Sequence, residues 1–285
     1  DQIVLGERIA THGRDDDPIQ LRRHSYRHGK ASGEVWIAEV DPRRARLTVE
    51  ADGEKPRPLG ELAKAAAERG DFVAINGSFY DERGPLDLVI SHGRLIRPLR
   101  RDGGSGVFLL RDGLPRIVHR DDYRKSRQVR HALQSIDRLV GDGKIVVRSR
   151  PEMPNDARSL VAVDREHRVF LAVFYDQAAV QREEAGLVYL NSDTSGTGPT
   201  LFDIAEFAKQ PRAAGGLGAD WALNLDGGLS TALLARVDGA RVGVVGIGET
   251  INAVQALVVP PPAASRPAAS QPATSQPATS QPGAR

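Results

Sequence analysis

Short segments in which apolar side chains alternate with polar ones, or run together over a few residues, dominate the middle of the chain. A period of two is typical of β-strands, in which successive side chains point to opposite faces. Turn dipeptides such as Asp-Pro and Asp-Gly separate these segments. Strands are therefore expected at residues 35–40, 46–50, 71–76, 107–110, 145–148, 159–163, 169–175, 221–226 and 253–259. The Asp41-Pro42 turn predicts that the first two pair as a hairpin.

Two segments have the pattern of helices. Residues 61–69 are rich in alanine and end before Gly70, and Thr200 fits the N-cap of a helix over 200–209 that Pro211 ends. Each helix leads into one of the expected strands. The expected fold class is α+β, with a mixed, largely antiparallel β-sheet core and packed helices in a single domain of residues 31–259.

The two ends of the chain differ from this middle part. Residues 1–30 form a polar N-terminal segment, of which 11–30 is expected to be a solvated loop. His24 and His28 have the spacing of a metal pair on a helix, but Gly29 and the lack of apolar periodicity favour the loop. Residues 260–285 are rich in Pro, Ala, Ser and Gln, and a segment of this composition is expected to be a disordered tail.

Composition excludes several classes of protein. The 39 basic and 37 acidic residues are interspersed and leave a net charge of +2, which argues against nucleic acid as a partner. The absence of cysteine excludes disulfides, thiolate metal sites and a cysteine nucleophile. No apolar run reaches membrane-spanning length. The start at Asp1 suggests a trimmed leader, and together with the tail it favours a secreted, periplasmic or cell-envelope protein.

Residues 221–232 hold the most informative pattern, because an alternating apolar run ends there in polar groups and two glycines. Asn224 and Asp226 are expected to project from one face of a strand about 7 Å apart. Gly227 and Gly228 would let the chain turn and present backbone N–H groups to an anion. The alternative is a simple hairpin, since Asp-Gly is also a strong turn signal.

A second segment of the same design favours a site over a turn. Residues 71–80 form a short apolar strand that ends in Asn76 and Gly77 and is followed by Phe79. The string AINGSFYDERGPLDLVISHG (74–93), together with ALQSIDRLVGDGKIV, NDARSLVAVD, TLFDIAEFAK and ALNLDGGLSTAL further along, resembles the phosphodiester glycosidase family. The likeness covers roughly residues 70–259 and is closest to the bacterial, exopolysaccharide-associated branch. The chain departs from the family pattern at Leu229, where many relatives carry glycine, and at Ile251, where many carry arginine.

The resemblance implies a hydrolase that cleaves a sugar 1-phosphodiester at the anomeric carbon, with a phosphate monoester as leaving group. It assigns catalysis to three residues: Asp226 as nucleophile or general base, Asn224 to orient it or the sugar, and Arg158 to bind the phosphate in a two-pronged way. A phosphate leaving group needs little protonation, so one carboxylate can suffice. The implied substrate-binding residues are Asn76, Gly77, Phe79, Ser159, Gly227, Gly228, Ser230 and Thr231.

Other interpretations of these residues stay open at this point. Arg158 could instead pair at the surface with Asp156 or Asp164. No cofactor is expected, although calcium or magnesium could bind carboxylates such as Asp226 or Asp87. The expected partner is a sugar phosphate or glycan, and the sequence gives no oligomeric state. The rival functions are a metal-dependent phosphodiesterase that attacks phosphorus and a non-catalytic carbohydrate or cell-wall binding module.

Overall fold

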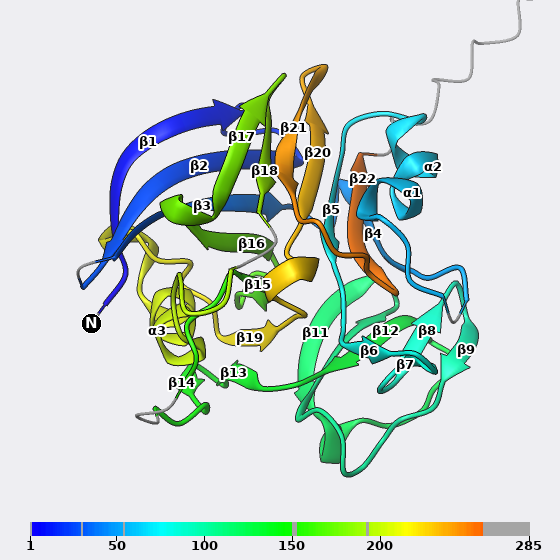
Figure 1. The fold of residues 1–285 in the computed structure, drawn as a ribbon. Helices are drawn as coiled ribbons and strands as arrows, with labels where there is room; N and C mark the ends of the chain where they lie inside the picture. The colour runs from blue at the N-terminus through cyan, green and yellow to red at the C-terminus, as the bar shows by residue number, and fades with distance from the viewer. Residues whose placement is uncertain (1, 30, 54, 150–152, 192–193, 259–285) are drawn as a thin grey trace, which may run out of the picture.

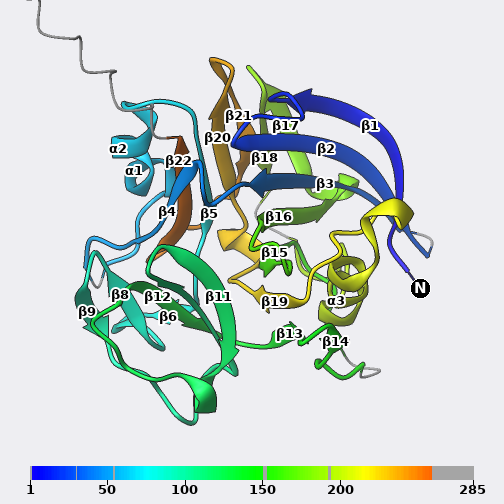
Figure 2. The same cartoon turned by 180° about the vertical axis from the view of Figure 1, so that it is seen from behind.

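The computed structural model describes residues 2–29, 31–53, 55–149, 153–191 and 194–258, so the tail prediction for residues 260–285 lies outside it. Three large β-sheets make up most of this part (Figure 1). Seen from both sides, the eight-stranded sheet and the five-stranded sheet lie on either side of β5 (Figure 2).

The eight-stranded sheet is antiparallel throughout its described pairs. In spatial order the strands are β1 (Val4–His12), β2 (Ile19–His28), β3 (Ala31–Val40), β16 (Val169–Asp176), β15 (Arg158–Val163), β19 (Trp221–Asn224), β13 (Arg138–Gly141) and β14 (Lys144–Ile145). Strand β16, near the middle of this sheet, consists almost entirely of apolar residues because both of its faces are buried.

The seven-stranded sheet contains one parallel pair, β18 with β21, and its other described pairs are antiparallel. In spatial order its strands are β17 (Val180–Glu184), β18 (Leu187–Leu190), β21 (Ala240–Val245), β20 (Leu233–Val237), β5 (Phe72–Asn76), β22 (Ala253–Val258) and β4 (Ala45–Glu50). The polar ends of β5 and β19 therefore belong to different sheets.

The five-stranded sheet follows β5 in the chain and is antiparallel. Its order is β11 (Leu114–His119), β10 (Gly106–Arg111), β12 (Val129–Ser135), β8 (Val89–Ser91) and β9 (Arg94–Arg97). A small hairpin, β6 (Tyr80–Asp81) with β7 (Gly84–Pro85), joins β5 to this sheet.

Three short α-helices cover outer faces of the sheets. Helices α1 (Leu59–Leu62) and α2 (Lys64–Ala67) lie over the seven-stranded sheet, and α3 (Leu201–Lys209) lies over the eight-stranded sheet. The 3₁₀ turns are η1 (Arg120–Asp122), η2 (Gln177–Ala179), η3 (Arg212–Ala214) and η4 (Gly228–Ser230). The predicted mixed, largely antiparallel sheet core is confirmed, but the fold is β-rich and has fewer helical residues than the α+β class implies.

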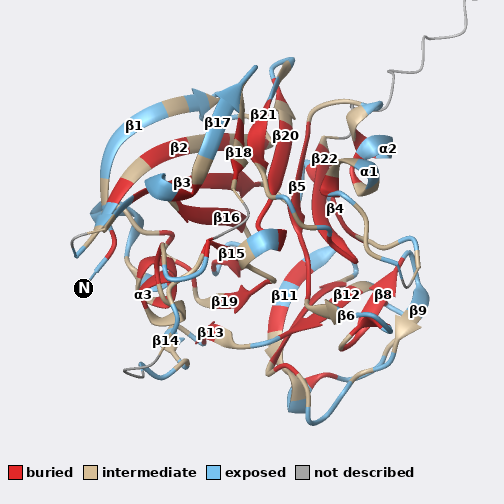
Figure 3. Cartoon of the chain, in the orientation of Figure 1, coloured by how far each residue is buried: buried red, intermediate tan, exposed pale blue. Residues whose placement is uncertain are grey.

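The main hydrophobic core lies between the sheets. It contains Trp36, Val161 and Leu223 from the eight-stranded sheet and Val73 and Ile75 from the seven-stranded one. The buried residues in Figure 3 accordingly run along the inner strands, whereas β1 and β17 are largely exposed. Leu223 and Leu225 are buried in this core with Trp221 packed against it, as their alternation predicts.

Two local predictions from the sequence are wrong. Residues 11–30 are not a solvated loop, because β1 and β2 extend the eight-stranded sheet. Charged residues in β2 are buried by pairing: Arg23 Nε lies 2.9 Å from Glu34 Oε2, and its Nη1 lies 2.6 Å from Glu183 Oε1. The strands at 35–40 and 46–50 exist but do not form a hairpin, since β3 and β4 belong to different sheets.

Helix α3 begins with the predicted cap. The Thr200 side chain accepts from the Asp203 amide, and Asp203 accepts in return from the Thr200 amide at 2.8 Å. Asp203 also lies 3.0 Å from His28 Nε2, so the cap fixes the helix against β2.

Replacement of this cap should lower stability without changing the fold. We expect Thr200→Ala to reduce the free energy of unfolding by about 1 kcal/mol, because a helix N–H loses its acceptor. Urea denaturation measures the change, and the exposed Thr11→Ala in β1 is the matched control. Equal effects of the two substitutions would contradict a specific role for the cap.

Candidate active site

The ends of β5 and β19 meet, although they are far apart in the chain and lie in different sheets. The Asn76 side-chain amide donates to the Asp226 carbonyl at 2.6 Å, and the Asp226 amide donates to the Gly77 carbonyl at 2.8 Å. The segment after β19 does not return as a hairpin, because β20 pairs with β5 in the seven-stranded sheet. The expectation that the two polar strand ends meet in space is therefore confirmed for these two loops.

Asn76 holds this junction together from a fully buried position. Besides its bond to Asp226, its Oδ1 accepts from the Ser159 hydroxyl at 2.7 Å and from the Ala232 amide at 3.1 Å. One side chain thus connects β5, β15 and both sides of the η4 turn. Asn76 and Ser159 were expected to bind substrate, but the structure gives both a positioning role beneath the site.

Gly77 is also structural. A Cβ added to it would lie 1.8 Å from Asn252 Oδ1, so no larger residue fits without a shift. Asn252 Oδ1 accepts from the Ser78 amide at 2.9 Å, and its side-chain amide donates to the Ser78 hydroxyl at 2.9 Å. The Thr250 hydroxyl accepts from the Gly77 amide at 3.3 Å. These buried contacts fix the chain leaving β5 against the start of β22.

Asp226 is the partly exposed carboxylate at this junction. Burial raises the pKa of Asp226 to about 6, the neighbouring Ser230 hydroxyl and the Gly227 amide lower it, and the charge of Asp156 raises it. The Gly227 amide donates to Asp226 Oδ1 at 2.9 Å. A carboxyl group with this pKa can exchange a proton near neutral pH, which suits a general base or a nucleophile.

Tyr80 is a site residue that the sequence reasoning missed. Its pKa is raised by burial and by the charge of Asp226, so the phenol stays protonated and can donate a hydrogen bond. It donates to the Glu249 carbonyl at 3.1 Å, and the Ser230 hydroxyl lies close to it as well. The signal was present in the sequence, because Tyr80 directly follows Phe79, which is itself half-buried.

The predicted anion nest of glycine amides is wrong. The Gly227 amide is bonded to Asp226, and the Gly228 amide donates to the Ala157 carbonyl at 2.9 Å. The glycines serve close packing instead, since a Cβ on Gly227 would lie 2.7 Å from the Ala157 carbonyl oxygen and Gly228 has a φ of 57°. These two amides are therefore not free to receive an anion in this structure.

Arg158 lies opposite Asp226 in the strand register, but its side chain bonds to other groups. Leu160 pairs with Asn224, which places Arg158 opposite Asp226 just beyond the end of β19. Its guanidinium donates to the carbonyls of Pro154 and Pro199 beside the start of α3. The surface-pair alternative does not hold, because Arg158 is only 9% exposed and Asp164 bonds to Arg168 instead.

The charge of a nearby carboxylate links Arg158 electrostatically to Asp226. Burial lowers the pKa of Arg158, and the charges of Asp156, Asp137 and Asp203 raise it. Asp156 therefore influences both Arg158 and Asp226. Its Oδ1 accepts from the buried Thr194 hydroxyl at 2.7 Å and from the Ala157 amide at 2.8 Å. Asp156 is a second residue that the sequence reasoning did not assign to the site.

The remaining predicted residues line the inner side of the same junction. Asn224 and Thr231 are buried, and within the described part of the chain Asn224 Oδ1 and Thr231 Oγ1 have no hydrogen-bond partner. Ser230 is 9% exposed and faces Asp226. Of the predicted catalytic and substrate-binding groups, Asp226, Phe79 and the 227–228 turn are therefore the most accessible.

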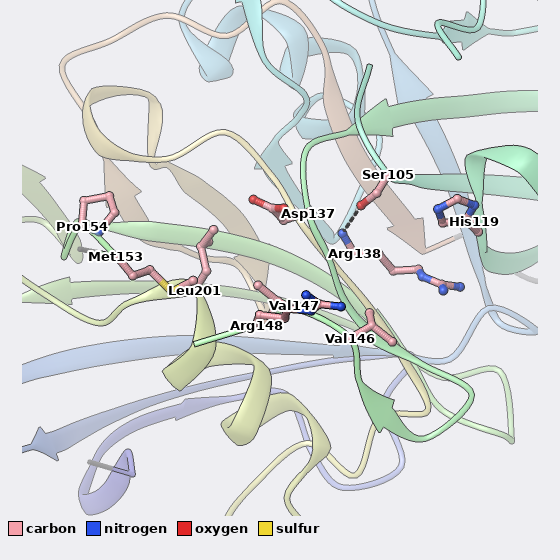
Figure 4. Close-up of a pocket in the computed structure, with 10 residues that line it drawn as sticks. All are labelled: Ser105, His119, Asp137, Arg138, Val146, Val147, Arg148, Met153, Pro154 and Leu201. Carbon is pink, nitrogen blue, oxygen red and sulfur yellow. Dashed lines mark hydrogen bonds between the residues drawn. The ribbon is translucent and has the colours of Figure 1, made fainter. Parts of the chain in front are cut away.

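A cavity of about 710 Å³ lies beside the Arg158 face of the sheet. Figure 4 shows Pro154 and Leu201 on one side of it, His119 and Arg138 on the other, and Arg148 between them. The Pro154 carbonyl that accepts from Arg158 belongs to a residue of its wall. This space is large enough for a sugar phosphate or part of a glycan.

Among the residues that the structure describes, no three His, Asp or Glu side chains are grouped to hold a metal ion. Asp87 is buried and accepts from the Gly104 amide at 2.8 Å, away from the Asp226 loop in the chain connecting β7 to β8. No helix in the described ranges is long and apolar enough to cross a membrane.

Comparison with known proteins agrees with this geometry. The family model for phosphodiester glycosidases matches residues 70–258, which include both strand ends and Arg158. The chain belongs to the phosphodiester glycosidase family. It is 28% identical over 184 residues to the uncharacterized protein YigE of Escherichia coli K12, covering 56% of this chain and 72% of YigE.

Solved structures show the same fold. The catalytic domain of zebrafish N-acetylglucosamine-1-phosphodiester alpha-N-acetylglucosaminidase, auto-inhibited by its pro-peptide, superposes with a TM-score of 0.61 at 17% identity, covering 89% of this chain and 87% of that one. A hypothetical protein from Synechocystis superposes with a TM-score of 0.58 at 15% identity, covering 84% and 62%. Residues outside the family match, including β1 to β4, thus belong to a fold found in these relatives.

The raised pKa of Asp226 predicts a pH-dependent cost to stability. Between an ordinary value of 3.8 and about 6, the folded protein binds a proton more tightly than the unfolded chain, so stability falls as pH rises through this window. This shift is worth at most about 3 kcal/mol. We expect Asp226→Asn to match the wild type at pH 4 and to be more stable at pH 7. Urea denaturation from pH 4 to 8 measures it.

The control for this experiment is the exposed Asp112→Asn, at a turn position with a φ of 52° that asparagine tolerates. Parallel stability profiles of the wild type and Asp226→Asn across the whole pH range would show that burial does not perturb this carboxyl group.

Close packing at Gly77 predicts a second stability effect. Gly77→Ala should lower the free energy of unfolding by about 3 kcal/mol, because the added methyl group collides with Asn252. Gly60→Ala in α1, where the nearest atom would lie 3.6 Å away, is the control and should be neutral or stabilising. Thermal and urea unfolding compare the two, and equal stability of both variants would mean that the Gly77 contact is easily relieved.

Proposed function

We propose that this protein hydrolyses a sugar 1-phosphodiester by attack at the anomeric carbon, releasing a phosphate monoester. The observation that carries the proposal is the partly exposed Asp226, whose pKa is raised to about 6, next to the hydroxyls of Ser230 and Tyr80. In this proposal Asp226 acts as the nucleophile or as the general base for water. Tyr80 and Ser230 would donate hydrogen bonds to the reacting sugar or phosphate.

Arg158 supports a phosphate on the leaving side. Its guanidinium is buried and bonded to two backbone carbonyls, and in the described ranges no carboxylate lies within salt-bridge distance of it. A buried cation that lacks a direct ion pair costs free energy that an anionic substrate would offset. Two of its five N–H donors go to carbonyls, which leaves donors for phosphate oxygens.

The sugar and the site of action are finer parts of the same proposal. The zebrafish enzyme is named for an N-acetylglucosamine 1-phosphodiester, and we propose a phosphodiester-linked sugar of this general kind here. An envelope or extracellular glycan as substrate is supported by the resemblance to the exopolysaccharide-associated branch and by the composition of residues 260–285. The proposed activity needs the ionised form of Asp226 and should therefore rise with pH through about 6.

Hydrolysis in ¹⁸O-labelled water tests the position of attack. With aryl and nucleotide-linked sugar 1-phosphates as substrates, we expect the label in the sugar and none in the phosphate. Asp226→Asn should lower kcat by a factor on the order of 10²–10⁴ while the substrate still binds. Mass spectrometry of both products, with and without EDTA, gives the result, and the exposed Asp122→Asn in η1 serves as an active control.

Each rival function has its own outcome in this experiment. Label in the phosphate together with loss of activity in EDTA would indicate a metal-dependent phosphodiesterase and overturn the proposal. Binding of glycans by the wild type without turnover of any sugar phosphodiester would indicate a carbohydrate or cell-wall binding module.

A further inference from the structure

A second hollow lies at strand β4, which is the edge strand of the seven-stranded sheet opposite β17. A groove of about 630 Å³ runs between β4, the β10–β11 turn and the start of β12. It borders a smaller cavity of about 150 Å³ between the sheet and α2. The two hollows share Arg46, Thr48 and His92, so we treat them as one feature, the β4 groove.

The β4 groove is strongly cationic. Arg46, Arg127 and Arg130 are exposed along it, and in the described part of the chain none of them has a carboxylate within salt-bridge distance. Of the two acidic residues in the groove, Glu50 is engaged by His92, whose Nε2 lies 2.9 Å from Glu50 Oε2. Asp112 is exposed at its rim. Arg130 Nη2 donates to the His92 carbonyl at 3.4 Å, but none of the three arginines has a carboxylate partner in the described residues. Three arginines that face one hollow without a paired carboxylate favour an anionic ligand.

Two buried polar groups in the wall have no partner of their own. Thr48 is 4% exposed and Gln255 is 6% exposed, and within the described residues Thr48 Oγ1 and Gln255 Oε1 make no hydrogen bond. They are cross-strand neighbours on β4 and β22 and both line the smaller cavity. A buried polar group without a partner costs about 1–3 kcal/mol, so a ligand that bonds to it is favoured.

The hydrogen-bonding groups that line the β4 groove indicate the chemical class of its ligand. The arginines match oxyanions, whereas Gln255 Oε1 can only accept and therefore matches a hydroxyl group. His131 Nδ1 lies 3.1 Å from the Val49 amide, and burial lowers the pKa of His131, so the neutral ring accepts there and carries its proton on Nε2. A sugar that bears a phosphate or carboxylate group supplies both an oxyanion and hydroxyls.

The β4 groove is separate from the Asp226 site but close to it. Ala253 on β22 pairs with Asn76 on β5 at one side and with Glu50 on β4 at the other. These three residues form one row, and a single strand separates its two ends. At the usual strand spacing this corresponds to about 10 Å between the Cα atoms of Asn76 and Glu50. A polymer could reach both sites, whereas a single monosaccharide could not fill both.

We propose that the β4 groove is a binding site for an acidic sugar unit, recognised through its phosphate or carboxylate group by Arg46 and Arg130 and through its hydroxyls by Thr48 and Gln255. Binding at this site does not depend on the proposed hydrolysis. The further role of the groove, to hold a charged unit of a polymeric substrate while Asp226 acts nearby, rests on the proposed function.

The test follows ligand binding by NMR of the full chain in low salt. The reporters are the Val49 amide and the ring signals of His131 and His92, which lie in the groove. The probes are glucose 6-phosphate, glucuronate, inorganic phosphate and uncharged glucose. We expect saturable shifts at these reporters with the first two probes, weakened by added salt, and none with glucose.

Variants then connect the shifts to particular side chains. Arg46→Gln and Arg130→Gln should each weaken binding of glucose 6-phosphate by about tenfold, as expected for loss of a hydrogen bond to a charged group, and Thr48→Val by up to about tenfold, because it loses a hydrogen bond to a sugar hydroxyl. The exposed Arg116→Gln in β11 is the charge-matched control. Thermal unfolding confirms that each variant is folded, and Thr48→Val should be no less stable than the wild type because it removes an unpaired hydroxyl.

Several outcomes would overturn the proposal. Absence of saturable shifts at Val49 would exclude a site, and equal binding by Thr48→Val, Arg130→Gln and Arg116→Gln would show that the groove groups do not bind the probe. Equal affinity for inorganic phosphate and glucose 6-phosphate would reject the sugar and leave a simple anion site. Asp226→Asn should keep the shifts whether or not it loses turnover, so failure here is distinguishable from failure of the proposed hydrolysis.

Discussion

The site depends on one buried side chain, Asn76, which connects three segments that the chain supplies from distant positions. Its amide fixes the Asp226 carbonyl, and its oxygen accepts from Ser159 and from the Ala232 amide. An asparagine suits this position because its side chain donates and accepts at once, which neither aspartate nor leucine of similar size could do. The eight-stranded and seven-stranded sheets are thereby held in a fixed relation at the point where Asp226 emerges.

The same junction carries features that lower stability. A partly exposed carboxyl group whose pKa is raised to about 6 and a buried guanidinium without a paired carboxylate in the described part of the chain are both unfavourable in the folded state. Both groups keep their positions because the elements around them are tightly packed, as at the Gly77 contact with Asn252, and these elements have little freedom to move. This combination of rigid support and locally unfavourable charge is typical of functional sites.

The sequence predicted the parts of the fold that local pattern controls. The strand at 221–226, the capping box at Thr200 and the polar ends of β5 and β19 all follow from residues close together in the chain. Pairing between distant strands is not a local property, which explains why the Asp41-Pro42 turn suggested a hairpin although β3 and β4 enter different sheets. Strand β2 was missed because Arg23 satisfies its charge with Glu34 on the next strand and with Glu183, which is far away in sequence.

The glycine amides show most clearly where sequence reasoning reached its limit. Two consecutive glycines after Asp226 fit both a turn that exposes N–H groups and a turn that packs against a neighbouring strand, and only the position of Ala157 and Asp156 decides between them. Because hydrogen bonds within the protein use both amides, the proposed recognition of an anion relies on cationic side chains. Arg158 at the junction and the arginines of the β4 groove are candidates for this role, and the β4 groove is connected to Asn76 across strand β22.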